Sequence, residues 1–235
     1  MSDDAPATTF VALLFPDITQ LDLTGPVQVF SRLPGARIEL AWHTLDPVPS
    51  DAGFSIMPTT TFDDAPQADI VMVPGGQGAF DLLDDEVALD FVRRQAADAR
   101  YVTSVCTGAF VLAAAGLLTG RRATTHWASH PMLDILGVQP VHERVVRDGN
   151  VFTGGGVTSG IDFALTVAAE LAGPAEAAKI QLALEYDPQP PMRAGSPSGA
   201  DADPAVVEAI RADAWRRREP VVRRAAERLA PNSAD

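Results

Sequence analysis

The chain has a single cysteine, Cys106, among its 235 residues, so it cannot form an internal disulfide. This composition suits a reducing compartment, and we expect a cytoplasmic protein. The N-terminal stretch MSDDAPATTF is acidic and lacks both a basic region and a long apolar run, so we expect no signal peptide. No apolar run approaches the roughly 20 residues that a membrane-spanning helix needs.

Basic residues are also scarce. Lysine and arginine together number 18 against 31 acidic residues, which gives a formal net charge of −13. A balance this acidic argues against binding to nucleic acid or to an anionic membrane. The hydrophobic fraction of 46% is ample for one sizeable globular domain.

Recognised cofactor and metal motifs are missing. The glycine-rich segment Pro74-Gly75-Gly76-Gln77-Gly78 has neither the G-x-G-x-x-G spacing of dinucleotide-binding folds nor the Gly-Lys-Ser/Thr of a phosphate-binding loop. The four histidines show no i, i+4 pairing, and there is no second cysteine. We therefore expect no cofactor and no metal.

Buried strands alternate with amphipathic helices along most of the chain. Near-continuous apolar runs predict strands at 9–15, 69–73 and 101–105, and alternation predicts another at 37–45. Thr24 is expected to cap the first helix, and the helix at 86–99 is expected to turn Val87, Phe91 and Val92 inward. This alternation predicts a doubly wound, flavodoxin-like α/β fold with a mostly parallel sheet flanked by helices.

Weaker sequence patterns predict the remaining helices, strands and loops. Residues 54–61 favour a hairpin or edge strand, 129–136 a short helix, and 141–152 a hairpin around Asp148-Gly149-Asn150. Helices are expected at 157–172 and 175–184. We expect residues 1–187 to form one α/β domain, 188–203 a loop rich in Pro, Gly and Ser, and 204–235 a helical tail whose arginines form a solvated face.

Cys106 lies where a predicted strand passes directly into a predicted helix that starts at Thr107. Such a turn holds its central residue in a strained, exposed position, as in a nucleophile elbow. The free N–H groups of the helix favour negative charge, so the thiol is expected to ionise easily and to act as a nucleophile. A lone cysteine is otherwise a small buried hydrophobe, but the strand–Cys–Thr–Gly–helix context favours the nucleophile.

Other polar and glycine-rich segments follow the ends of predicted strands. Asp22, between two leucines, follows the first strand, and Gly75-Gly76 follow the third. Because active sites of doubly wound sheets lie beyond the carboxyl ends of the strands, these residues are expected to meet Cys106 and Thr107. Asp22 could instead be a surface cap. His126 is a candidate base or a structural histidine, and the glycines at 154–156 give a close approach or a tight turn.

With these residues in place, the chain resembles the DJ-1/PfpI superfamily from about residue 9 to residue 186. The resemblance is carried by FPDITQLDLTGP (15–26), VPGGQG (73–78), SVCTGAFVLAAAGLLTGRRATTHW (104–127) and VTSGIDFAL (157–165). Within the superfamily the chain is most similar to isonitrile hydratases, which the segments HERVVRDGNVFTGGG and LEYDPQPP also resemble.

Differences from other branches of the superfamily narrow the range of activities that we expect. Protease- and chaperone-like members place a histidine directly after the cysteine, where this chain has Thr107, so peptidase activity is not expected. Glyoxalase members use a glutamate where this chain has Asp22. Regulators with a similar cysteine block carry a helix-turn-helix region of roughly 100 residues, longer than the segment after Pro188.

The resemblance implies hydration of an isocyanide to an N-substituted formamide. Cys106 would attack the isocyanide carbon to form a thioimidate, with Asp22, its pKa raised, as acid and base. Thr107 would orient water or ligand, and backbone N–H groups at Gly75, Gly76 and Thr107 would stabilise developing charge. The resemblance also implies a homodimer. A glyoxalase-like enzyme for small carbonyl compounds and a non-catalytic redox sensor remain the alternatives.

Overall fold

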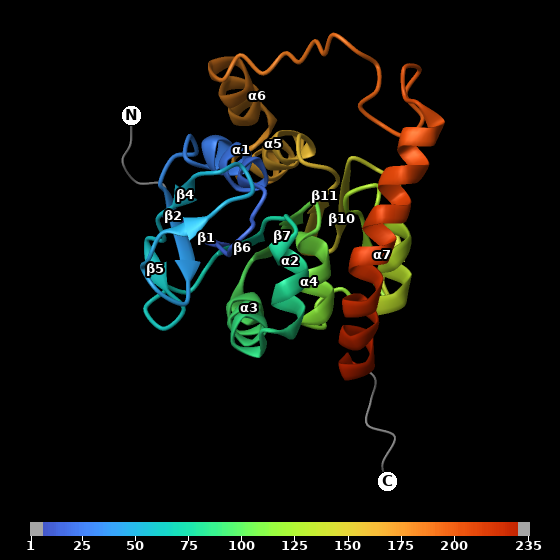
Figure 1. The fold of residues 1–235 in the computed structure, drawn as a ribbon. Helices are drawn as coiled ribbons and strands as arrows, with labels where there is room; N and C mark the ends of the chain where they lie inside the picture. The colour runs from blue at the N-terminus through green and yellow to red at the C-terminus, as the bar shows by residue number, and fades with distance from the viewer. Residues whose placement is uncertain (1–6, 230–235) are drawn as a thin grey trace.

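In the computed structural model, which describes residues 7–229, a seven-stranded sheet runs through the centre of the molecule (Figure 1). Its strand order is β10-β11-β7-β6-β1-β2-β5, and every neighbouring pair is parallel except β10 with β11. The strands are β1 (Thr8–Leu13), β2 (Ala36–Trp42), β5 (Thr60–Thr61), β6 (Ile70–Val73), β7 (Tyr101–Val105), β10 (Val145–Asp148) and β11 (Val151–Gly154). The predicted α/β class and mostly parallel sheet are confirmed.

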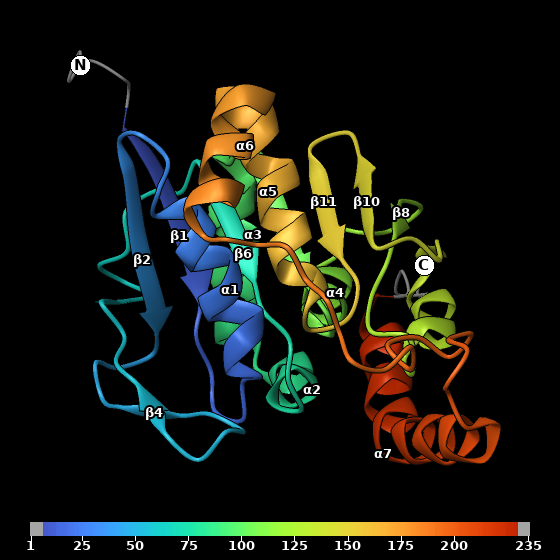
Figure 2. The ribbon, with the colours of Figure 1, turned by 90° about the horizontal axis from the view of Figure 1, so that it is seen from above.

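Helices cover both faces of the sheet (Figures 1 and 2). One face carries α1 (Gln20–Phe30), α5 (Ser159–Ala172) and α6 (Pro174–Ala183). The other carries α2 (Gly78–Asp81), η1 (Leu82–Asp84), α3 (Glu86–Asp98), α4 (Gly108–Ala114), η2 (His130–Leu136) and α7 (Pro204–Leu229). Because helices cover both faces of the sheet, both faces of the central strands are buried, and the sequences of these strands are continuous apolar runs.

The central strands provide the core. All residues of β6 and β7 are buried, as are the last four of β1. Phe10 of β1 stacks on Phe30 of α1 with ring centroids 4.5 Å apart, and Phe30 meets Phe163 of α5 edge-on. Burial of this apolar surface, at roughly 25 cal/mol per Å², is the main force that holds α1 and α5 against the sheet.

The order of the strands determines where a ligand can bind. Taken without the edge strands, the order is β2-β1-β6-β7-β11, the flavodoxin-like arrangement. The chain moves to one side of β1 to form β2 and then to the other side to form β6. The resulting switch point lies between the carboxyl ends of β1 and β6, where the connections diverge and leave room for a ligand.

The short strands match the weaker predictions closely. β10 and β11 form the expected antiparallel hairpin, and Gly149 in its turn adopts a positive φ of 61°. The β-prone stretch 54–61 supplies both predicted forms: β4 (Ser55–Ile56) pairs antiparallel with β3 (Val48–Pro49), while β5 forms the edge of the sheet. A further small pair joins β8 (Arg122–Ala123) to β9 (Gln139–Pro140).

Three local predictions need correction. The first helix starts at Gln20 rather than after Thr24, because Thr19 N–H donates to the carbonyl of Gly75 (2.9 Å) and this long-range bond sets the turn. Val87 does not face inward: it is 58% exposed, and the next two residues of α3 are buried instead. Residues 130–136 form 3₁₀ rather than α-helical turns.

The tail helix α7 packs on its own chain (Figure 2). It buries Ala214, Val222 and Ala225, and its later arginines form ion pairs with Asp84. Residues 188–203 contain no helix or strand, and their division from 1–187 and 204–235 as separate units stays a prediction. Within residues 7–229, no helix is long and apolar enough to cross a membrane.

Candidate active site

Cys106 occupies the sharp turn between β7 and α4. Its φ is +55°, in the left-handed region that a non-glycine residue adopts at a cost of about 1–2 kcal/mol. Two hydrogen bonds of the Cys106 backbone hold it there: its N–H donates to the carbonyl of Gly154 (3.0 Å), and its carbonyl accepts from the hydroxyl of Thr125 (2.7 Å). The predicted strained elbow is confirmed, but the residue is only 5% exposed rather than open to solvent.

The glycine loop after β6 touches the elbow directly. A Cβ added at Gly75 would lie 2.6 Å from Asp22 Oδ2, 2.6 Å from Thr107 N and 2.8 Å from Cys106 Cβ. Such distances are shorter than non-bonded atoms tolerate, so only glycine fits at this position. The structure therefore brings together the residues that follow β1, β6 and β7, as their positions in the sequence predicted.

Asp22 lies in the first turn of α1 and is fully buried. Its Oδ2 accepts the backbone N–H of Gly75 (3.0 Å), and its carboxyl and the thiol of Cys106 shift each other's pKa. Its Oδ1 has no hydrogen-bond partner among the described residues. An unpartnered carboxyl oxygen in a buried position costs about 1–3 kcal/mol, which indicates a group kept for a ligand rather than for stability.

Thr107 ties the glycine loop to the elbow. Its hydroxyl accepts the N–H of Gly76 and donates to the carbonyl of the same residue, each at 2.9 Å. The N–H groups of Gly75 and Gly76 therefore already donate within the protein, to Asp22 and Thr107. The expectation that these two groups act as free donors to developing charge does not fit this geometry, in which they position the carboxyl and the loop.

The electrostatic environment of Cys106 differs from the expectation. Burial raises the pKa of the thiol well above its ordinary value, and the neighbouring Asp22 carboxylate raises it further. A hydrogen bond from Thr107 N–H and the charge of Arg218 act in the opposite direction but are weaker. The predicted easy ionisation is therefore wrong for the free site, because desolvation of the thiolate outweighs the helix N-terminus.

Asp22 shows the raised pKa that was expected. Burial lifts the pKa of its carboxyl from 3.8 to about 7, although the bonds from Cys106 and Gly75 favour the charged form. Near neutral pH the carboxyl is therefore close to half protonated. The thiol and carboxyl form a buried pair in which the thiol, with the higher pKa, is the last group to lose its proton.

Arg218 of α7 was not identified from the sequence. Its guanidinium donates to Gln77 Oε1 (3.3 Å) and to the buried Ser129 hydroxyl (2.6 Å), and it lies 5.0 Å from the centre of the Phe80 ring. It is half-buried rather than part of a solvated face. Nothing in the run Arg216-Arg217-Arg218 separates it from its neighbours, so only the packing of α7 could have revealed it.

His126 lies near Arg218 as a neutral ring. Burial, with the positive charge of Arg218, lowers the pKa of its ring to about 4, so it is neutral at physiological pH. Its Nδ1 accepts the N–H of Ala128 (3.3 Å), and a Cβ at Gly156 would lie 3.3 Å from its ring. Among residues 7–229, no group of three or more His, Cys, Asp and Glu side chains is placed to hold a metal ion.

Comparison with known proteins gives one consistent result. The family model described as DJ-1/PfpI matches residues 9–170. Isonitrile hydratase from Pseudomonas putida is 56% identical over 92% of this chain and 96% of its own length. A crystal structure of a ThiJ/PfpI family protein from Pseudomonas syringae superposes with a TM-score of 0.89 at 39% identity, covering 96% of this chain and 97% of that one. Drosophila melanogaster DJ-1beta, 24% identical over 77% of this chain and all of its own, shares the fold with a TM-score of 0.70.

Proposed function

The chain belongs to the DJ-1/PfpI family, and we propose that it is an isonitrile hydratase that converts an isocyanide and water to an N-substituted formamide. The observation that carries the proposal is the buried Cys106–Asp22 pair, with one carboxyl oxygen left unpartnered beside a thiol in a strained elbow. The identity of 56% with the Pseudomonas putida enzyme over nearly the whole chain supports the same reading.

In the first step, Cys106 and Asp22 share one proton. As the sulfur attacks the terminal carbon of R–NC and a new S–C bond forms, the thiol proton passes to the ionised carboxyl of Asp22, which gives it to that carbon. The product is the thioimidate Cys–S–CH=N–R, with Asp22 now ionised. A carboxyl whose pKa is about 7 suits this exchange, because it is readily found in either protonation state near neutral pH.

In the second step, ionised Asp22 removes a proton from water, and the hydroxide adds to the thioimidate carbon. The nitrogen is protonated, the C–S bond breaks, and the formamide R–NH–CHO leaves while the proton returns to the Cys106–Asp22 pair. One water is consumed for each isocyanide. We assign Thr107 a positioning role: its hydroxyl holds Gly76, and its N–H stabilises negative charge on the sulfur.

The test is turnover of a small alkyl isocyanide, followed by formamide formation, with Cys106→Ala beside the native chain. We expect activity to fall to the uncatalysed background in Cys106→Ala, because the covalent step is lost. Mass spectrometry of the acid-quenched native enzyme should show Cys106 carrying the mass of one isocyanide. Ser196→Ala, a similar change in the exposed segment 188–203, should leave turnover unchanged.

Unchanged turnover in Cys106→Ala would refute the mechanism. A native enzyme without activity on any isocyanide would favour one of the alternatives. Lactate formation from methylglyoxal would then identify a glyoxalase-like enzyme, and peroxide oxidation of Cys106 without turnover would identify a redox sensor. We further propose, from the single cysteine, that the protein is cytoplasmic and, from the family resemblance, that it is a homodimer.

A further inference from the structure

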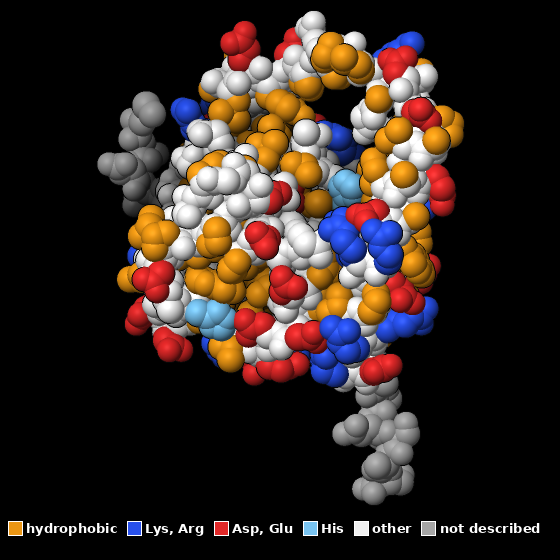
Figure 3. Space-filling model, viewed as in Figure 1, with side chains coloured by type: hydrophobic (Ala, Val, Ile, Leu, Met, Phe, Trp, Pro, Cys, Tyr) orange, Lys and Arg blue, Asp and Glu red, His pale blue; other side chains and the backbone are white. Residues whose placement is uncertain are grey.

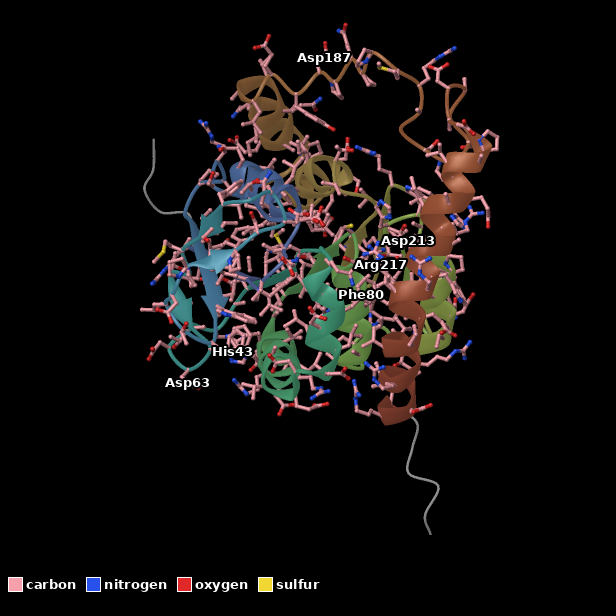
Figure 4. All side chains as sticks on the ribbon, in the orientation of Figure 1. His43, Asp63, Phe80, Asp187, Asp213 and Arg217 are labelled. Atoms are coloured by element: carbon pink, nitrogen blue, oxygen red, sulfur yellow. The ribbon has the colours of Figure 1, made fainter. Side chains whose placement is uncertain are left out.

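A cleft of about 380 Å³ separates the first half of α7 from the turn that contains His126 and Ala128. Figure 4 labels Phe80, Asp213 and Arg217 beside it, and the space-filling view shows the surface hollowed between α7 and the rest of the molecule (Figure 3). On the α7 side the lining residues are Ala209, Ile210, Asp213, Ala214, Arg217 and Arg218. We call this space the α7 cleft; its volume lies at the lower end of the roughly 300–1,000 Å³ typical of small-molecule sites.

Residues of two walls of the α7 cleft connect it to the elbow that holds the reactive thiol. Arg218 forms part of one wall, and its positive charge opposes, weakly, the rise in the pKa of the Cys106 thiol that burial causes. On the opposite wall, His126 follows directly after Thr125, whose hydroxyl donates to the Cys106 carbonyl. Arg218 also donates to Gln77, the residue that follows Gly75 and Gly76. The cleft and the elbow thus share the same supporting residues.

The lining of the α7 cleft suits an uncharged organic group. Asp213 forms ion pairs with Arg217 (2.6 Å) and Arg216 (2.5 Å), and Arg218 donates to the neutral side chains of Ser129 and Gln77. The rest of the lining is apolar, apart from the neutral ring of His126. An alkyl or aryl group placed against these residues would bury apolar surface.

We propose that the α7 cleft receives the organic substituent R of the isocyanide, and that Ala209 and Ile210 thereby determine which isocyanides are accepted; this inference rests on the proposed function. The shape of the substrate supports it. An isocyano group is a narrow linear rod with its carbon at the tip, so it can reach a thiol that is only 5% exposed while R stays outside. A bulky R then needs a space next to the elbow, and the α7 cleft supplies one.

The test is Ala209→Trp, assayed with methyl isocyanide and cyclohexyl isocyanide. Ala209 is exposed on α7, so the change fills the α7 cleft without disturbing the core. We expect kcat/KM for the cyclohexyl substrate to fall at least about tenfold, with little change for the methyl substrate, because only the larger group needs the filled space. Ala212→Trp is the control, since Ala212 is exposed on the same helix and does not line the cleft.

An independent readout is the rate at which Cys106 is alkylated by N-methylmaleimide and N-cyclohexylmaleimide. Ala209→Trp should slow the bulky reagent more than the small one, and Ala212→Trp should slow neither. Equal losses for both isocyanides, or no loss for either, would overturn the cleft assignment while native turnover of methyl isocyanide still upheld the proposed function. A native enzyme that hydrates no isocyanide would overturn both.

Discussion

At the scale of single residues, the site combines groups that stability alone would disfavour. Cys106 has a strained backbone, and Asp22 keeps a carboxyl in a fully buried position with one oxygen unpartnered. Each feature has a free-energy cost of order 1–3 kcal/mol, which the surrounding apolar packing must offset. Free-energy costs that are concentrated in two side chains close together in space are typical of a reactive site.

Asp22→Asn should therefore reduce activity while it raises stability at higher pH. Because the folded pKa of Asp22 is about 7 against 3.8 for the free group, its stabilising contribution is complete below pH 4 and is lost as the pH rises to 7 and above. Asparagine does not titrate. The variant should gain stability relative to the native chain between pH 4 and pH 8, by at most about 4 kcal/mol.

Urea denaturation at pH 4 and at pH 8 measures the gain in stability of Asp22→Asn. In the same variant, the rate of formamide formation should fall at least about 100-fold. Asp63→Asn, at an exposed position, is the control and should change neither quantity by much. A variant with native activity would show that Asp22 is not the acid and base. Equal stability differences at pH 4 and pH 8 would show that its pKa is not raised.

Gly75→Ala should disrupt the geometry of the site more than the fold. Its new methyl group would meet Asp22 Oδ2 and Thr107 N at 2.6 Å, so the carboxyl and the elbow must move apart. A displacement of about 1 Å between reacting groups costs roughly 100-fold in rate, and we expect a loss of kcat of that order. Steady-state kinetics would measure it. Gly195→Ala, where an added Cβ meets nothing within 4 Å, should retain native kinetics.

At the scale of elements, α7 matters because it completes the surroundings of the elbow. Its arginine Arg218 contacts the glycine loop through Gln77, the helix α2 through Phe80, and the turn before η2 through Ser129. The first two segments follow one another in the chain, but the turn before η2 lies far from them in the sequence. A single side chain from the tail helix therefore joins them and forms part of the wall of the α7 cleft.

Arg218→Met should loosen this connection and raise the pKa of the Cys106 thiol, since the Arg218 charge lowers that pKa in the native protein. The Ser129 hydroxyl, fully buried, would lose its partner, at a cost of about 1–3 kcal/mol in the free energy of unfolding. The pH dependence of Cys106 alkylation and urea denaturation measure the two effects. Arg216→Met, at an exposed site on the same helix, should produce neither; an unaltered alkylation profile in Arg218→Met would contradict the electrostatic role.

At the scale of the whole molecule, the topology of the sheet explains why so few residues make the site. The switch point between β1 and β6 brings the segment after each strand to one edge, and β7 lies next to β6 with Cys106 at its end. Residues 22, 75 and 106, separated by tens of positions, thus meet without a long loop. The proposed homodimer would bring two such sites together in one particle, and it stays a prediction.

The sequence by itself determined the fold class, the elbow and the meeting of Asp22, Gly75 and Cys106, because these depend on local signals. Apolar runs without alternation indicate strands buried on both faces, and a residue placed directly after such a strand must lie at the carboxyl edge of the sheet. The raised pKa of Asp22 also followed from its leucine neighbours, which indicated burial.

Only the tertiary structure decided the protonation of Cys106, the start of α1 and the place of Arg218. Each depends on groups distant in the chain: the thiol is desolvated by its surroundings and by Asp22, and α1 begins where Thr19 binds Gly75. Arg218 and its two neighbouring arginines are alike in sequence, and only the rotation of α7 against the body of the molecule turns one of them toward the site. Long-range packing and desolvation leave no local pattern, which is why they had to be seen in three dimensions.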